Sequence, residues 1–189
     1  QAITRPRLVT SKAVMESLIP PKRVRPLANT PSSDDRAALF DRDRNLMDKP
    51  QHMARLLSWA LADLMLAHPE IIVAGEDVGP KGGVYNVTAK LHERFGSARV
   101  INTLLDEQSI LGLGIGAAHN NLLPITEIQF LAYVHNAEDQ LRGEAATLSL
   151  FASGQYTNPM IVRTAGLGYQ KGFGGHFHND NSLAVFRDI

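Results

Sequence analysis

The chain has no cysteine among its 189 residues, which excludes disulfide bonds and thiolate metal ligands. It also lacks an excess of charge of either sign, because 19 Lys and Arg balance 19 Asp and Glu. No global field therefore favours nucleic acid or an anionic membrane. No apolar run approaches the roughly 20 residues that a bilayer span requires. We expect neither a nucleic-acid partner nor a membrane partner, and a reducing compartment suits the composition.

Residues 1–50 differ in composition from the rest of the chain. They hold six of the ten prolines and ten of the 19 Lys and Arg, and they sustain no apolar periodicity. Such a segment buries too little surface to offset its chain entropy. We expect a Pro-rich basic linker or arm over 1–50, with one short helix over 11–18, and a domain over 51–189.

After residue 50 the apolar patterns alternate between helical and strand type. Helices are predicted over 51–67, 87–95, 109–120 and 137–151, and strands over 71–74, 100–103, 123–130 and 160–164, with a loop over 75–83. In the first helix the predicted apolar face consists of Met53, Leu56, Leu57, Ala60, Leu61, Leu64 and Met65. The alternation predicts an α/β fold, a parallel sheet with helices on both faces. Ligands bind beyond the carboxyl ends of such strands, where Glu107, Tyr133 and the 166–182 loop are expected to meet.

The segment 104–118 places two carboxylates before a run of apolar and small residues. A carboxylate that leads into such a run is expected to be partly buried, which raises its proton affinity. The alternative is that it caps the helix by accepting backbone N–H bonds, and we assign that role to Asp106. The flanking Leu104 and Leu105 favour Glu107 as the group that carries chemistry.

The glycines of this run fit the dinucleotide pattern GxGxxA only in part. That fingerprint needs a strand directly before its first glycine, whereas polar residues 106–109 precede Gly112. Glycine inside a helix costs about 1 kcal/mol relative to alanine, and this cost usually has a packing reason. We interpret Gly112, Gly114 and Gly116 as positions where a neighbour approaches the helix backbone closely.

A second group of polar residues lies in the Gly-rich loop near the end of the chain. Zinc is one interpretation of His176, His178 and Asp180, but a structural zinc site takes four ligands that usually include Cys. A histidine that carries protons on an active-site loop is favoured over zinc. A surface loop with solvated histidines remains the alternative.

Several motifs follow one another in a fixed order along the chain. They are Ala74-Gly75-Glu76-Asp77-Val78-Gly79, Gly83-Val84-Tyr85, Asp106-Glu107-Gln108, Pro124 with Glu127-Ile128-Gln129-Phe130 and Tyr133, Asp139-Gln140 with Glu144-Ala145-Ala146, and Pro159-Met160-Ile161-Val162-Arg163. This series resembles the beta part of the E1 component of thiamine-diphosphate-dependent 2-oxo acid dehydrogenases, in the transketolase superfamily. The resemblance runs from about residue 54 to the end of the chain. It implies the thiamine-diphosphate-binding fold and its pyrimidine-binding domain, truncated at the C-terminus.

The resemblance also implies roles for four residues. Glu107 would meet the ring nitrogen N1′ of the cofactor's aminopyrimidine, and Tyr133 would pack on that ring. Leu105 would help to shape the same pocket. His178 would take part in proton transfer or in acyl transfer to a lipoyl arm. The family holds the diphosphate and Mg²⁺ through a GDG motif that this sequence lacks, so both are expected to be bound by an E1 alpha-like domain, fused or separate.

The implied activity is decarboxylation of a 2-oxo acid, with transfer of the acyl group to a lipoyl-bearing E2. The resemblance suggests a dimer or heterotetramer, in a bacterial cytoplasm rather than a mitochondrial matrix, and predicts that this stretch alone is inactive. Asp106 replaces the family's usual Ser, and residues 178–181 read HNDN where the family often has HSQS, which leaves substrate and acceptor open. His176 has no family counterpart. The alternatives are a transketolase-type or deoxyxylulose-phosphate-synthase-type enzyme, or a non-catalytic subunit that keeps the fold for assembly.

Overall fold

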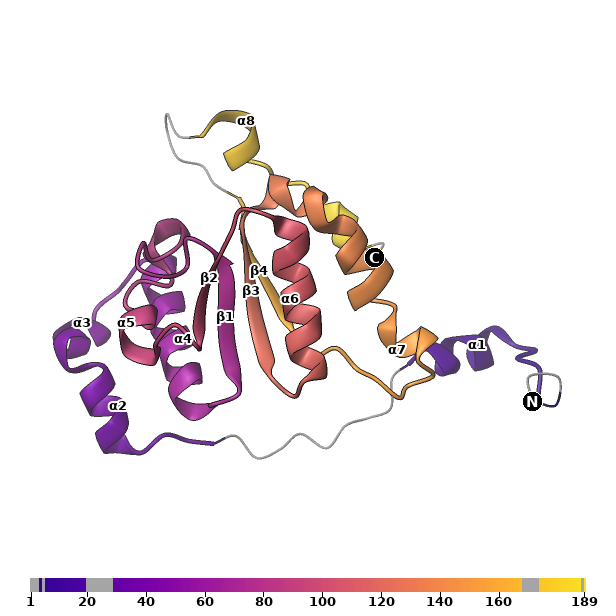
Figure 1. Cartoon of the computed structure of the whole chain (residues 1–189), viewed down its shortest axis with the longest axis horizontal. Coiled ribbons are helices and arrows are strands. Elements are labelled where there is room, and N and C mark those ends of the chain that lie inside the picture. Colours follow the sequence, from indigo (N-terminus) through magenta and orange to yellow (C-terminus); the bar gives the residue numbers. More distant parts are fainter. Residues whose placement is uncertain (1–3, 5, 20–28, 168–173, 188) are drawn as a thin grey trace.

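The computed structural model describes residues 4, 6–19, 29–167, 174–187 and 189. Its sheet is formed by β1 (Ile71–Glu76), β2 (Val100–Thr103), β3 (Leu123–Phe130) and β4 (Ile161–Ala165). The strand order is β2-β1-β3-β4, and all neighbouring strands are parallel (Figure 1). The predicted parallel sheet is confirmed. Parts of the predicted arm and of the predicted 166–182 loop, residues 20–28 and 168–173, lie outside the described residues.

The sheet separates two apolar layers, and helices cover both of its faces as predicted (Figure 1). On one face Ile71 and Val73 of β1 belong to a buried cluster that includes α4 and α5. On the other face, Ile110 and Leu111 of α6 pack with Ile128 of β3. The helices in these layers are α4 (Met53–Ala67), α5 (Leu91–Phe95) and α6 (Glu107–His119).

The remaining helical elements are short. They are α1 (Ser11–Leu18), α2 (Ser33–Leu39), η2 (Asp41–Asp43), α3 (Arg44–Met47), η3 (Val84–Asn86), η4 (Leu131–Ala137), η5 (Gln140–Ala145), α7 (Leu148–Phe151), α8 (Gly175–His178) and η6 (Leu183–Arg187). The helix predicted over 11–18 is confirmed. Among the described residues, no helix is both long enough and apolar enough to cross a membrane.

Two predicted helices are wrong in extent. The one expected over 87–95 is helical only from Leu91, because Lys90 before it adopts a left-handed backbone conformation with φ 66°. The one expected over 137–151 is replaced by η4, the π-helix η5 and α7. Gly143 lies inside η5, and the backbone N–H of Ala146 donates to the Leu141 carbonyl, five residues back. A glycine in mid-segment weakens a regular α-helix, and a π turn takes its place.

The first strand is two residues longer than predicted. Gly75 and Glu76, expected in a loop, pair with neighbouring strands, Gly75 opposite Glu127 and Glu76 opposite Thr103. A Cβ at Gly75 would lie 2.7 Å from the Glu127 carbonyl oxygen. Glycine is required because the two backbones approach this closely, and the extended strand carries the Glu76 carboxylate to the edge of the sheet.

The predicted apolar face of α4 is only partly correct. Leu61 and Met65 are buried, together with Trp59 and Ala62, which the predicted face did not contain. Met53, which is 72% exposed, shares an open apolar face with Leu56, Leu57 and Leu64. A helix that is apolar on two sides is typical of a helix between two layers of protein.

Part of the predicted arm packs against the domain. Helices α2 and α3 lie beside α4, and Phe40 between them is only 3% exposed in the apolar cluster of α4. The Arg36 guanidinium forms two hydrogen bonds with the Asp63 carboxylate of α4, of 2.7 and 2.6 Å. The described residues of the segment 29–47 therefore contribute to the core, and the domain boundary near residue 50 stays a prediction.

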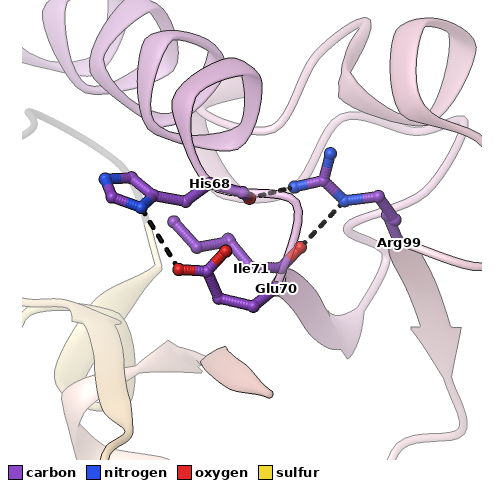
Figure 2. Close-up of polar contacts among 4 residues, drawn as sticks. All are labelled: His68, Glu70, Ile71 and Arg99. Atoms are coloured by element: carbon purple, nitrogen blue, oxygen red, sulfur yellow. Dashed lines mark hydrogen bonds and ion pairs between the residues drawn. The ribbon is translucent and has the colours of Figure 1, made fainter. Parts of the chain in front are cut away.

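Arg99 fixes the start of β2 to the turn that precedes β1 (Figure 2). Its Nη2 donates to the His68 carbonyl at 2.7 Å, and its Nε donates to the Ile71 carbonyl at 3.0 Å. In the same turn, Nδ1 of His68 lies 3.2 Å from Oε1 of Glu70. A single guanidinium thus donates hydrogen bonds to two backbone carbonyl groups in the connection between α4 and β1.

Candidate functional site

Polar side chains follow each strand at the carboxyl edge of the sheet. Glu76 is the last residue of β1, and Glu107 begins α6 directly after the turn that follows β2. Tyr133 lies in η4 after β3, and His178 ends α8 after β4. This is the edge at which parallel sheets bind ligands, and α8 lies beyond the strand ends in Figure 1.

The two adjacent carboxylates at the start of α6 have different environments. Asp106 occupies the N-cap position, as predicted, but its Oδ2 accepts from the Ser109 hydroxyl at 2.5 Å rather than from a backbone N–H. Glu107 is half-buried, and it has no hydrogen-bond or ion-pair partner among the described residues. The Asp106 carboxylate is therefore already engaged within the helix start, whereas that of Glu107 can accept a proton or a hydrogen bond from a ligand.

Glu76 is a candidate site residue that the prediction missed. Burial raises the pKa of its carboxyl, and the nearby carboxylates of Asp77 and Glu107 raise it further, while Lys81 opposes them. Glu76 lies opposite Thr103 at the end of β2, and Glu107 begins the helix after the following turn, so the ends of β1 and β2 bring these two groups to the same edge. The signal in the sequence was the GEDVG motif, which contained Glu76 but was interpreted as a loop.

Tyr133 and His178 meet in an aromatic cluster at the end of β3. The Phe130 and His178 rings lie edge to face with centroids 4.3 Å apart, and the Phe130 and Tyr133 centroids are 6.0 Å apart. The Tyr133 hydroxyl lies 3.4 Å from Nε2 of His178. Tyr133 also packs against the buried cluster that contains Ile110, one turn after Glu107. The structure thus brings together two predicted residues and connects them by packing to the helix that carries Glu107.

The hydrogen bond at Nδ1 determines the orientation of the His178 ring. Nδ1 lies 2.7 Å from the Gly174 carbonyl oxygen, which can only accept, so Nδ1 carries the proton. In the neutral ring Nε2 is then an acceptor, and the Tyr133 hydroxyl donates to it. A Cβ at Gly174 would lie 2.2 Å from Cβ of His178, so only glycine lets the histidine occupy this position.

The other residues of this loop give little support to the zinc interpretation. His176 is exposed, and its ring lies against the Phe177 ring, with centroids 5.0 Å apart. Hydrogen bonds from Ser182 hold the pKa of the Asp180 carboxyl below its ordinary value. Over the described ranges, no three His, Asp or Glu side chains are placed to hold a metal ion.

The two leucines before Glu107 are not the cause of its burial. Leu104 is 88% exposed and Leu105 is 69% exposed, although these flanking leucines favoured Glu107 as the group that carries chemistry. They follow the end of β2 in a short turn whose side chains extend away from the core. Whether Leu105 shapes a pocket therefore depends on what covers it, and its role stays a prediction.

The carboxyl edge of the sheet suits an aromatic ring of a cofactor and disfavours a diphosphate group. A carboxylate that has no partner among the described residues (Glu107) and a half-buried aromatic ring (Tyr133) suit a flat heteroaromatic ring that donates a hydrogen bond. The Glu76, Asp77 and Glu107 carboxylates at the same edge would repel a diphosphate. The residues present fit an aminopyrimidine ring, and a diphosphate needs cationic groups from elsewhere.

Comparison with known proteins identifies the same domain. The sequence profile of the family described as "Transketolase, pyrimidine binding domain" matches residues 49–187, which include all four strands. The matched range begins beside α4, and the open α4 face and the exposed Leu105 both lie within it.

Curated relatives are dehydrogenase subunits. The 2-oxoisovalerate dehydrogenase subunit beta of Bacillus subtilis is 37% identical over 131 residues, which are 69% of this chain and 39% of the relative. The pyruvate dehydrogenase E1 component subunit beta of Leifsonia xyli is 38% identical over 111 residues, 59% of this chain and 33% of the relative. The mitochondrial 2-oxoisovalerate dehydrogenase subunit beta 2 of Arabidopsis thaliana is 39% identical over 138 residues, which are 73% of this chain and 38% of the relative. The aligned part of the chain spans less than two fifths of the length of each of these three relatives.

Proposed function

Since this chain belongs to the transketolase pyrimidine-binding domain family, we propose that it forms the pyrimidine-binding half of an E1-type 2-oxo acid dehydrogenase that depends on thiamine diphosphate. Its named relatives are beta subunits of dehydrogenases for pyruvate and 2-oxoisovalerate. The proposed reaction is decarboxylation of a 2-oxo acid and transfer of the acyl group to a lipoyl carrier.

The observation that carries the proposal is the Glu107 carboxylate at the carboxyl edge of the sheet. It is half-buried, has no partner among the described residues, and lies near a second carboxylate, Glu76, whose pKa is raised. In the proposed site, Glu107 accepts a hydrogen bond from N1′ of the aminopyrimidine and so holds the proton at that ring nitrogen. When bound, the cofactor supplies the electron sink that decarboxylation of a 2-oxo acid requires.

Three further residues act around Glu107 in the proposed site. Tyr133 packs its ring against the pyrimidine, and its hydroxyl orients His178. Because Nδ1 of His178 donates to Gly174, Nε2 is the nitrogen that accepts from the Tyr133 hydroxyl, and in the proposed site it takes up a proton when that hydroxyl donates elsewhere. Leu105, which is exposed in this chain, covers the edge of the ring and excludes water.

The partners complete what this chain lacks. We propose that an E1 alpha-like domain, fused or separate, holds the diphosphate and Mg²⁺. The carboxylates at this edge repel a phosphate group, and this sequence lacks the GDG motif that the resemblance assigns to binding of both groups. The open apolar face of α4 supports an assembly in which protein covers that helix, in a dimer or heterotetramer. A lipoyl-bearing E2 is the proposed acyl acceptor. We place the assembly in a bacterial cytoplasm, since two of the three relatives named above are bacterial.

Replacement of Glu107 by Gln in the full-length subunit, assembled with its diphosphate-binding partner, tests the proposal. Loss of proton exchange at the ring nitrogen should lower the decarboxylation rate by about 10²-fold or more. Asp106→Asn is the matched control, because it removes the adjacent carboxylate without touching the proposed site, and it should retain most of the activity. Titration of the cofactor measures binding separately from turnover.

Two results would contradict the proposal. Unchanged turnover in Glu107→Gln would favour a subunit that keeps the fold for assembly only. Decarboxylation by the purified 189-residue chain alone, with cofactor and Mg²⁺, would show that the site does not need a second half.

A further inference from the structure

A basic pocket lies away from the Glu107 edge, between the first half of α4, the turn around η3, and α5. Its volume is about 210 Å³. Four of its lining residues carry basic side chains, namely His52 and Arg55 from the α4 side, Lys90 from the turn, and Arg94 from α5. None of the residues assigned to the proposed thiamine site lines it. This pocket is therefore a separate feature that the proposed function does not use.

The positive charge of the pocket is only partly compensated. Asp43 is the single acidic residue among the described residues of the lining. Its Oδ2 accepts from Nε1 of Trp59 at 3.1 Å and lies 3.9 Å from Nη2 of Arg94. Within the part of the chain that the structure describes, Arg55 and Lys90 have no ion-pair partner. Arg55 lies over the Trp59 ring, with Cζ 6.0 Å from its centroid, which leaves its N–H groups available to an acceptor. An excess of two charges thus remains in a concave site.

The backbone that forms one wall of the pocket is held in an unusual conformation. Tyr85, Asn86 and Lys90 all line the pocket, and all have left-handed backbones, with φ of 56°, 59° and 66°. Two buried neighbours, Val87 and Thr88, anchor this turn, and the Thr88 N–H donates to the Gly82 carbonyl at 2.9 Å. Residues other than glycine keep this conformation only where surrounding structure imposes it, which is most common at ligand sites. The turn thus fixes the backbone of Asn86 and Lys90 along this wall of the pocket.

We propose that this pocket binds the phosphate group of a small phosphomonoester. Donors line it from three elements: the Arg55 guanidinium and the Ser58 hydroxyl on α4, Asn86 and Lys90 on the turn, and Arg94 on α5. A tetrahedral dianion with three terminal oxygens can accept from several directions, whereas a carboxylate accepts mainly in one plane. The volume admits one such group with a short organic part and is too small for a nucleotide.

Trp59 makes binding directly observable, because it is the only tryptophan of the chain and lines the pocket beneath Arg55. Titration of the purified chain with inorganic phosphate and with glycerol phosphate should produce a saturable change in its fluorescence. Broadening of the ³¹P resonance measures the same binding without the tryptophan. Loss of one charged hydrogen bond corresponds to about tenfold or more in affinity, so Arg55→Gln and Lys90→Gln should each raise Kd by that factor.

The matched control is Lys49→Gln, which removes one positive charge from an exposed position outside the pocket lining and should leave Kd unchanged. If sodium chloride at equal ionic strength causes the same change, or if neither pocket variant weakens binding, the proposal is overturned. Tighter binding of succinate than of phosphate would also overturn it and would favour an acidic protein segment as the occupant. If a variant fails to fold, the Tm of the unchanged chain is measured with and without phosphate instead. A rise in Tm with phosphate supports the site, and an unchanged Tm contradicts it.

Discussion

Glu127 and Arg163 form an ion pair inside the sheet, at directly opposite positions of β3 and β4. Nε and Nη2 of the arginine both donate to Oε2 of the glutamate, the first at 3.0 Å. The Glu127 side chain is 1% exposed. Its second oxygen, Oε1, is buried without a hydrogen-bond partner among the described residues, so the carboxylate depends on this arginine for its charge balance.

Replacement of Arg163 by Met should therefore be strongly destabilising. It leaves a buried carboxylate without its cation, and breaking such a pair from one side costs about 3–5 kcal/mol. The double variant Glu127→Gln with Arg163→Met should recover much of this loss, because it removes both charges. Urea unfolding of the unchanged chain, Arg163→Met, Glu127→Gln and the double variant measures the four free energies. If the losses of the two single variants simply add in the double variant, the pair contributes no coupling and this account is wrong.

Two glycines of α6 should respond in opposite ways to alanine. A Cβ at Gly114 would lie 2.6 Å from Cγ2 of Thr126 and 2.9 Å from Cε of Met160, so Gly114→Ala should destabilise the chain by about 1–3 kcal/mol. A Cβ at Gly112 would meet no atom within 4 Å, so Gly112→Ala should stabilise it by up to about 1 kcal/mol. Thermal unfolding of the purified chain distinguishes them, and equal effects would contradict the packing described.

The glycines of α6 also show which features of the fold could be predicted from the sequence. Close packing was predicted for all three glycines, yet only Gly114 faces a strand, while Gly112 and Gly116 face open space. The periodicity of a helix indicates which residues share a face, but the neighbour that covers each face comes from tertiary structure. For this reason Met53 and Leu56, which lie on the open side of α4, were predicted on the same apolar face as the buried Leu61.

The strands were predicted more accurately than the turns. The bounds of β2 and β3 agree with the prediction, because both segments are rich in β-branched and apolar residues. The left-handed conformations of Tyr85 and Lys90 left no signal in the sequence, since buried neighbours impose them. At the candidate site, the alternation of strands and helices was enough to predict that Tyr133 and His178 lie at the same edge of the sheet. Glu76 could not be predicted there, because β1 was expected to end two residues before it.

Arg99 should be more important for stability than its partly exposed position suggests. It donates to the carbonyl groups of His68 and Ile71, and hydrogen bonds from a charged group contribute about 1.5–3 kcal/mol (Figure 2). Arg99→Met should lower the free energy of unfolding by about 2–3 kcal/mol, and Arg99→Lys should restore only part of it, because an ammonium lacks the fork. Arg44→Met, at an exposed position, is the control. An equal loss in Arg99→Met and this control would refute the role.

Gly174→Ala should displace His178 without unfolding the domain. The added Cβ would lie 2.2 Å from Cβ of the histidine, whereas a Cβ at Gly175 would meet no atom within 4 Å. Both glycines have positive φ, so Gly175→Ala controls for backbone strain. The imidazole resonance of His178 should shift only in Gly174→Ala. In the assembled enzyme the misplaced histidine should lower acyl transfer on the order of 10²-fold, and equal rates in the two variants would argue against a role for His178.

Glu76 should make the stability of the chain depend on pH. Burial raises the pKa of its carboxyl above the ordinary value of 4.5, with Asp77 and Glu107 adding to the effect, so the folded chain binds this proton more tightly than the unfolded chain does. The free energy of unfolding therefore falls as the pH rises from below 4.5 through the raised folded value, and it stays lower above that value.

Glu76→Gln removes this titration, so the variant should be more stable than the unchanged chain at pH 7 and should lose that advantage below pH 4.5. Glu93→Gln, at an exposed position of α5, controls for the loss of one negative charge. Thermal unfolding of the three proteins between about pH 4 and pH 8 measures the difference. An advantage of Glu76→Gln that grows as the pH falls would reverse the sign and would mean that Glu76 is stabilised in its charged form, which is incompatible with a carboxyl held among other carboxylates at the edge of the sheet.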